Sequence, residues 1–573
     1  MTCSSRNERF NRAVAALEPL WQAAYDDGVA RHEPLPDMTM ADCLAATVAR
    51  QPDATHIVHR DSALTYRQTD AAANSLAAAL AQAGCCKGDA VVVMLENSPE
   101  LIIAYMACYK AGFVAVGQNP RSTADELART LRDASPTAMV APSGKTPLTA
   151  EALELAGLQP LRCLVTAGEP ASAAAAQLAT VELSFENAAS NRNAAAPSEA
   201  PQPDDTAVII YTGGTTGVCK GCPITHRMLL QAQRLFYRDL EPLLGNGRAM
   251  TSLVTSPMIH AYGLNFGVNW GFVVGGAVVL ADKLDGPSLL ALIERHRPSV
   301  WGAVPTLLND LCCAEDASLA DTSSLRAVVV SCAATSGEIM RRFSQLHPAV
   351  HVVEDYGMTE TAGPVTLTPV LKGASTGSVG VPCIDTDVLV VNLETGEEPL
   401  PFNQRGEVIF RGPQVIREYW HSPAESARAF RDGWIYSGDV GYFDETGCLF
   451  VVDRIKDVVL VGGFTVFPRE IDEVLFTHPA VADTCTIGVA DARSGERPKS
   501  FVVTSPGAAA SQQELIDYCH KHLLAYKCPR YVEFIDAIPL THMGKPDKKA
   551  LRAREAQAEK QRAQDEAVRA AGI

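Results

Sequence analysis

Three features that would point to a membrane, to nucleic acid or to an oxidising compartment are missing from the sequence. The most apolar run, Gly271 to Ala281, is too short and too rich in glycine to span a bilayer, and no apolar signal segment follows the start. Acidic side chains outnumber basic ones by 66 to 49, and the net charge of −17 would repel nucleic acid and anionic membrane surfaces. The 16 cysteines lack the spacing of a disulfide framework or of paired zinc ligands. We therefore expect a cytoplasmic protein with reduced thiols and no integral membrane segment.

Length and composition predict at least two domains. The chain has 573 residues, of which 47% are apolar, and this is more than one small core can use. From about Met38 onward, helical patterns such as Ala71 to Ala83 alternate with short apolar runs such as Ala90 to Leu95, which favours βα units and a largely parallel sheet. The segment from Ala171 to Asp205 is rich in Ala, Ser, Asn and Pro. We interpret it as a surface loop that leads into a strand over Ala207 to Tyr211.

The C-terminal part of the chain indicates a second, smaller α+β domain. A turn at Asp444 to Gly447 predicts a hairpin, and the charged segment from Asp453 to Asp457 follows it. We therefore predict an N-terminal domain over residues 1–452 with an extension at 1–37, a hinge at 453–457 and a C-terminal domain over 458–573. The elements expected in the C-terminal domain cover Glu470 to Leu475, Thr484 to Val489, Lys499 to Thr504, Gln512 to His522 and a charged helix from Ala550 to Ala571.

The strongest local motif is the glycine- and threonine-rich run from Tyr211 to Gly221. It follows an apolar strand and precedes a helix that Thr225 is expected to cap. Glycines let backbone amides turn toward an anion, threonine hydroxyls add donors, and Lys220 supplies a positive charge. It is not the Walker loop, because Lys220 stands at the wrong distance from Gly217 and no Ser or Thr follows it. The run predicts a grip on nucleotide phosphates, with a flexible surface turn as the alternative.

Three weaker motifs follow along the chain. Tyr356-Gly-Met-Thr-Glu360 combines an aromatic ring, a hydroxyl and a carboxylate, which would suit a nucleotide site in which Glu360 holds Mg²⁺. In Ser437-Gly-Asp439 the carboxylate could accept hydrogen bonds from ribose hydroxyls, with Arg454 as a further donor. Met543-Gly-Lys545 ends in a cation that could reach a transferring group. Each motif alone also fits a turn or a solvated charge, so only the combination indicates a function.

In this order, the four motifs resemble those of the superfamily of adenylate-forming enzymes, which contains acyl-CoA synthetases, adenylation domains of peptide synthetases and firefly luciferase. The resemblance covers roughly residues 40 to 555. Strings similar to those of the family stand at Leu64 to Tyr66, Lys87 to Asp89, Glu96 to Pro99, Gly377 to Gly380 and Gly406 to Val408. The resemblance implies an α/β fold in which a large N-terminal domain is followed by a smaller, mobile α+β C-terminal domain.

Carried over position by position, the resemblance implies roles for individual residues. Lys545 would bridge the carboxylate and the α-phosphate during adenylation, and His260 would lie beside the acyl site. The other implied assignments are a phosphate loop with Thr212, Gly213, Gly214, Thr215, Thr216, Gly217 and Lys220, adenine contact by Tyr356, α-phosphate and Mg²⁺ contacts by Thr359 and Glu360, ribose contacts by Asp439 and Arg454, a hinge at Lys456, a thiol tunnel at Gly463, and an acyl pocket with Tyr262, Phe266 and Asp355.

Departures from the family pattern affect mainly the acyl side. Cys219 replaces the proline usual before the loop lysine, and Ser331 to Thr335 replaces a Ser-Gly-Gly-Ala-Pro string. Asp355 stands where glycine is common. A carboxylate there would disfavour a long apolar tunnel, because burying a charge without a partner is expensive. The alternative is that Asp355 points away from the acyl site and pairs locally.

The resemblance implies an AMP-forming acyl-CoA synthetase that uses ATP, Mg²⁺ and CoA. The acid would be fatty, aryl or compact with a polar tail, and the sequence does not decide among these. One alternative is a stand-alone adenylation enzyme that loads a separate carrier protein, and another is a nucleotide-binding protein without catalysis. The expected partners are a small carboxylic acid, ATP and CoA rather than nucleic acid. A homodimer is compatible with the sequence, which leaves the oligomeric state open.

Overall fold

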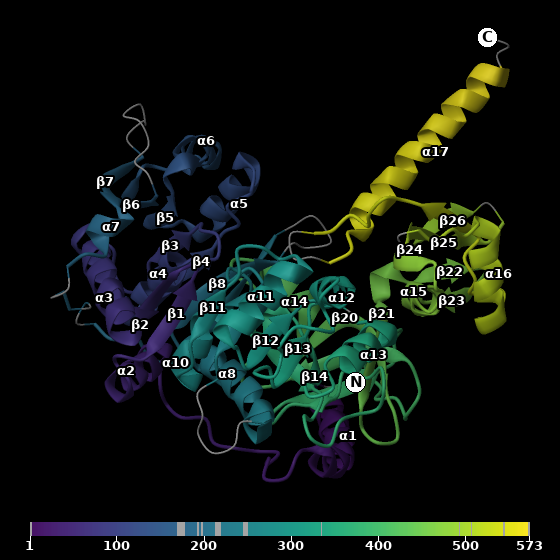
Figure 1. The fold of residues 1–573 in the computed structure, drawn as a ribbon, viewed down its shortest axis with the longest axis horizontal. Helices are drawn as coiled ribbons and strands as arrows, with labels where there is room; N and C mark the ends of the chain where they lie inside the picture. The colour runs from purple at the N-terminus through teal and green to yellow at the C-terminus, as the bar shows by residue number, and fades with distance from the viewer. Residues whose placement is uncertain are drawn as a thin grey trace.

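The computed structural model describes residues 3–168, 178–191, 194–195, 197, 199–212, 219–243, 250–333, 335–491, 493–505, 507–541 and 545–570. These residues form four β-sheets with helices packed around them. Three sheets belong to the N-terminal part of the chain, and the fourth belongs to a smaller C-terminal unit on its flank (Figure 1). The mixed α/β architecture expected from the sequence is confirmed. No helix among the described residues is long and apolar enough to cross a bilayer.

The first sheet is parallel apart from one edge strand. In spatial order its seven described strands are β7 (Ala179–Ser184), β6 (Leu161–Ala167), β5 (Ala138–Pro142), β3 (Ala90–Val93), β4 (Val114–Gly117), β8 (Thr206–Thr212) and β9 (Lys220–Thr225). Only β9 runs antiparallel to its neighbour, β8. Strands such as β4 are buried along their whole length, which explains why they read as continuous apolar runs rather than as alternating ones.

The second sheet carries the strand that matters most for the candidate site, β14. In spatial order its nine described strands are β16 (Val381–Pro382), β15 (Pro364–Leu367), β14 (His351–Gly357), β13 (Ala327–Val330), β12 (Val300–Ala303), β10 (Ser252–Val254), β11 (Val278–Leu280), β1 (Thr55–His59) and β2 (Ser62–Thr65). Strands β10 to β14 are parallel to one another, and β15 turns back along the end of β14. Successive side chains of β14 therefore face opposite sides of the sheet near its edge.

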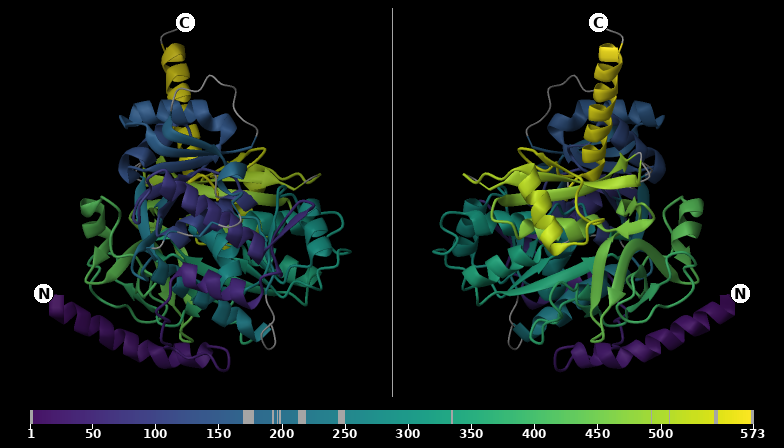
Figure 2. Two further views of the ribbon diagram at one scale, coloured as in Figure 1. Left: turned by 90° about the vertical axis from the view of Figure 1, so that its left-hand side faces the viewer. Right: turned by 90° about the vertical axis from the view of Figure 1, so that its right-hand side faces the viewer.

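A third, antiparallel sheet completes the N-terminal part. Its described strands are β17 (Asp387–Val391), β18 (Gly406–Arg411), β20 (Trp434–Phe443), β19 (Phe430–Arg431) and β21 (Leu449–Arg454). The turn expected at Asp444 to Gly447 does join two antiparallel strands, β20 and β21. Helix α1 (Cys3–Ala24) lies along the outside of this part, far from the end of the last helix (Figure 2).

Local sequence signals explain where the helices begin and end. For example, Ser98 caps α4 with Pro99 in its first turn, and Gly112 in the left-handed conformation ends it. The remaining helices of the N-terminal part are α2 (Met40–Arg50), α3 (Tyr66–Gln82), α4 (Pro99–Ala111), α5 (Ala124–Ala134), η1 (Ser143–Lys145), α6 (Thr146–Ala156), α7 (Phe185–Ala188), α8 (His226–Leu240), η2 (Glu241–Leu243), α9 (Ala261–Leu264), η3 (Asn265–Asn269), α10 (Trp270–Val274), α11 (Gly286–His296), α12 (Pro305–Cys313), α13 (Gly337–Leu346), η4 (Thr359–Thr361) and α14 (Pro423–Ala429).

The C-terminal unit is a small α+β structure followed by a projecting helix. After η5 (Ile455–Asp457) its described elements are β22 (Val459–Val461), β23 (Phe464–Val466), α15 (Pro468–Phe476), β24 (Val481–Asp491), β25 (Gly495–Thr504), α16 (Gln512–His522), β26 (Tyr531–Phe534) and α17 (Lys548–Ala570). Each element expected there is present, and α16 has the predicted bounds. Figure 1 shows α17 leaving the body of the molecule. The hinge and the two domain limits stay predictions, although η5 covers most of the expected hinge.

One expectation about the N-terminal part is wrong, and one strand was not predicted. The segment from Ala171 to Asp205 is not simply a loop, because β7 and α7 lie within it and β7 forms the edge of the first sheet. The strand character of β7 depends on its pairing with β6, which the alanine-rich composition of the segment does not indicate. The phosphate-loop motif does precede a helix capped by Thr225, as predicted, but strand β9 begins at the end of the motif and precedes that helix, α8.

Candidate active site

The residues predicted to hold the adenine and ribose lie together. Tyr356 on β14 donates a hydrogen bond from its hydroxyl to Asp439 Oδ2 at 2.8 Å. Asp439 on β20 also pairs with Arg454 on β21, with 3.2 Å between Oδ1 and Nε, and these two residues are register partners in the third sheet. Burial raises the pKa of the Asp439 carboxyl, while Arg454 and the Tyr356 hydroxyl act in the opposite direction. The protein itself therefore satisfies both carboxylate oxygens.

The turn predicted to handle phosphates and metal follows directly on β14. Thr359 and Glu360 lie in η4, and the backbone oxygen of Glu360 accepts a 2.9 Å hydrogen bond from the Ile416 amide. The Glu360 side chain is buried, and its Oε1 accepts a 2.8 Å hydrogen bond from the Tyr419 hydroxyl. The second carboxylate oxygen of Glu360 is the one left to act as an oxygen ligand of the kind that Mg²⁺ prefers.

Tyr419 connects this turn to the phosphate-loop lysine, and sequence reasoning missed it. The ammonium group of Lys220 lies 4.4 Å from the centre of the Tyr419 ring, a cation–π geometry. The same ammonium group is 3.6 Å from Glu425 Oε2. Nothing in the sequence near Tyr419 indicates this contact, because more than fifty residues separate it from Glu360 and the contact exists only in the folded chain.

The phosphate loop itself is described only at its ends. Thr212 closes β8 opposite Lys220 on β9, and its hydroxyl lies 3.4 Å from the Lys220 carbonyl oxygen. The predicted contacts at Gly213, Gly214, Thr215, Thr216 and Gly217 fall outside the described residues. The chain on either side of these residues lies in two strands that pair with each other, β8 and β9.

Lys545 is the residue of the C-terminal unit that reaches the N-terminal site. Burial lowers the pKa of its ammonium group, and the charged groups that act on it include Asp439, Arg454 and Glu360. Cys332 is also among the titratable groups that lie near the Lys545 ammonium group. A lysine nearly a hundred residues beyond the third sheet thus shares an electrostatic environment with the residues predicted to hold the nucleotide.

The predicted acyl residues gather on the opposite face of β14. Tyr262 and Phe266 are buried with their ring centres 5.1 Å apart, and the Tyr262 hydroxyl donates to the Val329 carbonyl oxygen at 2.7 Å. His260 is the N-cap residue of α9. Tyr262 lies within α9, and Phe266 lies in η3, which continues the same helix. Burial and the Asp355 carboxyl group both raise the pKa of Tyr262, so that carboxyl group lies near this cluster.

Asp355 differs from the other carboxylates of the site. It is buried, and its Oδ1 has no hydrogen-bond partner within the part of the chain that is described. Burial raises the pKa of the Asp355 carboxyl to about 7, while the Ser331 side chain acts in the opposite direction. Burial raises the pKa of the Cys332 and Cys383 thiols, and Asp355 also contributes to that rise, so both cysteines lie near it. The part of the alternative in which Asp355 pairs locally is not met at Oδ1 among the described residues, and the place of Asp355 in the acyl pocket stays a prediction.

Of the two further predicted residues, Lys456 lies near enough to Asp439 and Arg454 for both to act on its pKa, whereas Gly463 has no such contact among the described residues. Lys456 in η5 and Gly463 between β22 and β23 are both exposed. Gly463 has a φ of 86°, and apart from its chain neighbours no atom of the described residues lies within 4 Å of the position that a Cβ would take. In this arrangement of the chain Lys545 therefore joins the site, whereas Gly463 faces open space.

The residues present fit a magnesium ion that is held largely by phosphate. Among the described residues no three His, Cys, Asp or Glu side chains gather into a metal cage. Mg²⁺ at nucleotide sites commonly takes one or two carboxylates together with substrate phosphates and water. Buried Glu360, with one oxygen engaged by Tyr419, meets that requirement.

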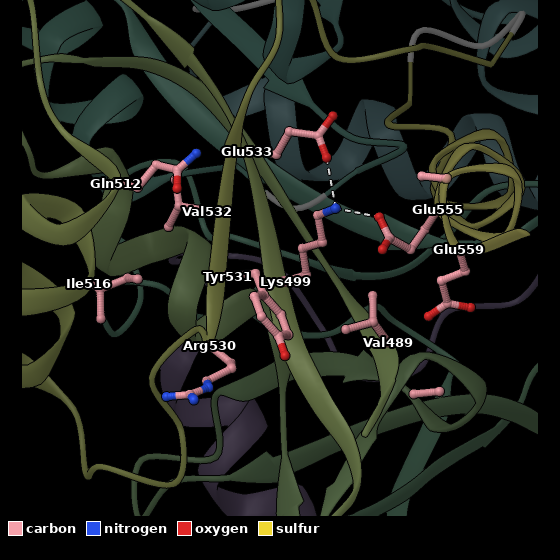
Figure 3. Close-up of a pocket in the computed structure, with 12 residues that line it drawn as sticks. Val489, Lys499, Gln512, Ile516, Arg530, Tyr531, Val532, Glu533, Glu555 and Glu559 are labelled. Carbon is pink, nitrogen blue, oxygen red and sulfur yellow. Dashed lines mark hydrogen bonds and ion pairs between the residues drawn. The ribbon is translucent and has the colours of Figure 1, made fainter. Parts of the chain in front are cut away.

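A separate hollow of about 450 Å³ lies in the C-terminal unit, between its sheet and α17. Figure 3 shows Lys499 of β25 reaching Glu533 of β26 and Glu555 of α17, and its ammonium group is 2.7 Å from Glu533 Oε2. Lys499 and Glu555 are both buried. Because the charges there satisfy one another, we interpret the cluster as the attachment of α17 rather than as a catalytic site.

Comparison with known proteins gives consistent results over most of the chain. Residues 44–420 match the AMP-binding enzyme family, and residues 470–545 match the AMP-binding enzyme C-terminal domain. The chain is 32% identical over 543 residues to the long-chain-fatty-acid–CoA ligase of Bacillus subtilis (strain 168), covering 92% of this chain and 96% of that protein. It is also 32% identical over 507 residues to a feruloyl-CoA synthase from Amycolatopsis sp., covering 88% and 96%. The fold resembles the anthranilate CoA ligase AuaEII in complex with anthranoyl-AMP, with a TM-score of 0.81, 24% identity and coverage of 91% and 98%.

Proposed function

Because the chain belongs to the AMP-binding enzyme family, we propose that it converts a carboxylic acid, ATP and CoA into acyl-CoA, AMP and pyrophosphate through an acyl-adenylate. The observation that carries this proposal is the approach of Lys545 to Asp439 and Glu360, since it brings a cation of the C-terminal unit to a nucleotide site built by the N-terminal part. The expectation of an AMP-forming acid–thiol ligase agrees with relatives that are named as CoA ligases.

The first half-reaction is a problem of bringing anions together. A carboxylate oxygen of the acid forms a bond to the α-phosphorus of ATP, and the bond from that phosphorus to pyrophosphate breaks. In the proposed mechanism Lys220 and Lys545 neutralise the negative charge, Asp439 orients the ribose, and Glu360 holds Mg²⁺, which supplies further neutralisation. Tyr356 and Tyr419 support this arrangement by fixing the carboxylates of Asp439 and Glu360.

The second half-reaction exchanges AMP for a thiol. The sulfur of CoA attacks the acyl carbon, loses its proton and displaces AMP, which leaves with the bonding electron pair. We propose that Lys545 withdraws at this stage as the C-terminal unit rotates about Lys456, and that Gly463 then lines the thiol path. In this structure Gly463 is exposed while Lys545 is half-buried near Asp439 and Glu360, which is consistent with such a division of labour.

The reaction is tested by measuring AMP release with a panel of acids in the presence and absence of CoA. The panel consists of octanoate, palmitate, benzoate, ferulate, 4-aminobenzoate, 6-hydroxyhexanoate and 6-aminohexanoate. We expect CoA-dependent AMP release and a thioester product with at least one acid. Pyrophosphate exchange without turnover on CoA would favour the loading of a carrier protein instead. The absence of both activities, with retained binding of ATP, would favour a protein that only binds nucleotide.

We further propose that the preferred acid is compact or has a polar tail. The support is Asp355, whose buried Oδ1 lacks a partner among the described residues and whose carboxyl group lies near Tyr262. A hydroxyl or amino group on the acid could donate to that oxygen, whereas an alkyl chain would leave a buried polar atom unsatisfied. A carboxyl whose pKa is raised to about 7 can accept a neutral or a cationic donor near neutral pH.

This proposal about the acid is tested with Asp355→Asn and Asp355→Gly. The wild type should prefer a tail with a hydroxyl or amino group over palmitate, and Asp355→Gly should raise kcat/KM for longer apolar acids relative to the wild-type substrate by about 10-fold. Asp355→Asn keeps the size of the side chain and should mainly reduce the preference for amines. Palmitate as the best wild-type substrate, or an unchanged profile in Asp355→Gly, would show that Asp355 does not shape the acyl pocket.

The expected cytoplasmic location remains a prediction.

A further inference from the structure

A buried amide joins the acyl-side helix to the turn that carries Thr359 and Glu360. Asn265 begins the π-helical turn η3, directly before Phe266, and its side chain is buried. Its Nδ2 donates a 2.7 Å hydrogen bond to the carbonyl oxygen of Ala362, the residue that closes η4. A π-helical turn inside a helix is uncommon and is frequently associated with functional sites.

The residue that Asn265 holds is in a demanding conformation. Ala362 has a φ of 53°, in the left-handed region that is unfavourable for a residue with a Cβ. Its amide donates to the Thr359 carbonyl oxygen at 3.1 Å, which closes η4, and the left-handed conformation of Ala362 then redirects the chain after the turn. Such a conformation persists only where the surroundings hold it. The hydrogen bond from Asn265 is one of those constraints.

The support behind Asn265 is itself ordered. Gln233 on α8 donates through Nε2 to Asn265 Oδ1 at 2.9 Å and to the Asn265 carbonyl oxygen at 3.1 Å. Further along η3, Asn269 accepts a 3.2 Å hydrogen bond from the Tyr109 hydroxyl. All four side chains of this network are buried. The Asn265 amide is therefore oriented so that its donor points at Ala362 and its acceptor at Gln233.

Contacts other than the one from Asn265 also hold the turn. Tyr419 contacts the Glu360 side chain at 2.8 Å, and the Ile416 amide contacts the Glu360 backbone oxygen at 2.9 Å. A Cβ at Gly363 would lie 2.6 Å from the Cβ of Ala232, so α8 is packed directly against the chain leaving the turn. Among these contacts, the one from Asn265 comes from the helix that also presents Phe266 to the acyl side.

We infer that Asn265 is a positioning residue for adenylation, which fixes the Thr359–Glu360 turn relative to the helix that lines the acyl side. This inference rests on the proposed function. Misplacing a catalytic group by about 1 Å can cost about 100-fold in rate, so a single hydrogen bond at this point has large consequences. The expected loss is in the rate of adenylation rather than in affinity for the acid, because Asn265 contacts the turn and not the acid-facing side chains directly.

The principal test is Asn265→Asp, with Tyr109→Phe as the matched control. The first variant keeps the shape of the side chain and the acceptor for Gln233 but removes the donor to Ala362, and the control removes one hydrogen bond from the same network without touching the turn. With the panel acid that wild type converts fastest, Asn265→Asp should lower kcat of pyrophosphate exchange by about 10- to 100-fold with KM for the acid changed less than about 3-fold. Tyr109→Phe should stay within about 3-fold of wild type.

The pH profile separates positioning from a general loss of structure. A protonated carboxyl at position 265 can donate to the Ala362 carbonyl oxygen, whereas an ionised one cannot. The ratio of variant to wild-type exchange should therefore rise as the pH falls from about 8 to about 6. Asn265→Ala also loses the donor but gains no titratable group, so its ratio should stay low throughout. It also serves as the test variant if Asn265→Asp does not fold.

Affinity for MgATP, measured by calorimetry without any acid, keeps this inference separable from the proposed function. Weaker MgATP binding by the Asn265 variants, with binding by Tyr109→Phe unchanged, would support the positioning role even if no panel acid were activated. Exchange rates and MgATP affinities of folded Asn265 variants that match wild type within about 3-fold would overturn it. A loss in Tyr109→Phe as large as that in Asn265→Ala would also overturn it, since the contact with Ala362 would then not be special.

Discussion

Two adjacent residues of β14, Asp355 and Tyr356, face opposite sides of the sheet and meet different environments. On the nucleotide side, the Tyr356 hydroxyl donates to Asp439, and Arg454 pairs with the other oxygen of the same carboxylate. On the predicted acyl side, Asp355 is buried, as Asp439 is, but its Oδ1 finds no partner among the described residues. The chain thus completes the polar contacts of one side and leaves a polar atom of the other side unsatisfied.

The difference in hydrogen bonding between Asp439 and Asp355 matches the different tasks proposed for the two sides of β14. In the proposed reaction ATP is used whatever the acid, so a site for the nucleotide can be built in advance from groups that hold one another in place. The acid is what distinguishes one family member from another, and a buried oxygen that lacks a protein partner selects for a ligand that can supply one. The comparison predicts that changes on one side of β14 alter nucleotide use and that changes on the other alter acid choice.

The largest effect is expected where the two sides meet, at Lys545. This ammonium group is influenced both by Asp439 on the nucleotide side and by Cys332 next to the acyl side. Lys545→Ala should lower the rate of acyl-adenylate formation by about 100- to 1,000-fold, because it removes a charge needed when two anions approach. Thiolation of a supplied acyl-adenylate should change less than about 3-fold. Comparable losses in the two half-reactions, each measured in single turnover, would contradict the assignment.

Gly463→Trp should produce the reverse pattern and leave both sides of β14 intact. Its position is exposed and open, so the new side chain is accommodated in the arrangement seen here, at about 1–2 kcal/mol for a positive φ. We expect turnover with CoA to fall by about 30-fold or more while pyrophosphate exchange stays near wild type, since only the thiol path is filled. Gly463→Ala is the control for the backbone strain. Normal CoA turnover in the tryptophan variant would remove Gly463 from the thiol path.

Asp439→Asn tests the nucleotide side directly. It takes the negative charge from between Tyr356 and Arg454, and leaves the Arg454 guanidinium without its counterion. We expect KM for ATP to rise by about 10-fold, with the order of preference among the panel acids unchanged. Steady-state kinetics at fixed acid and varied ATP measures the first effect. A changed order of acids would break the separation between the two sides of β14.

The last effect concerns stability rather than activity and belongs to the acyl side. Burial raises the pKa of Asp355 from 3.8 to about 7, so between these values the folded protein keeps a proton that the unfolded chain releases. The contribution of this carboxyl to the free energy of unfolding is therefore complete below about pH 4 and falls as the pH rises toward about 7. Asparagine does not titrate, so Asp355→Asn should lack this pH-dependent loss. The free energy of unfolding of the variant minus that of wild type should therefore increase from about pH 4 to about pH 7, by on the order of 1–4 kcal/mol. Urea unfolding at several pH values measures it, and a pH-independent difference would contradict the assignment.

The sequence predicted elements well where the signal was local. Strand β8, the Thr225 cap, the β20–β21 hairpin and α16 all follow from periodicity, capping and turn residues close together in the chain. It failed for β7, whose strand character depends on pairing with β6. It also missed the intervening β9, since a strand of six residues carrying Gly and Pro resembles a loop when read alone.

The candidate site divides in the same way. Residue type and order along the chain were enough to single out Tyr356, Glu360, Asp439 and Lys545, because a nucleotide needs those chemical groups and the resemblance to a family gives their order. Tyr419 and Asn265 could not be found like this. Their importance lies in a contact with Glu360 or Ala362 across long stretches of chain, and ordinary tyrosines and asparagines carry no mark of such a contact.

The sequence by itself determined the class of reaction and the polar groups that serve it, since those depend on the identity of side chains. Only the tertiary structure decided which way each group faces. It placed Asp355 and Tyr356 on opposite sides of one strand, brought Lys545 to Asp439, and left one oxygen of Asp355 buried without a protein partner. The physical reason is that burial and hydrogen bonding are properties of a packed environment, which is assembled from residues far apart in the chain.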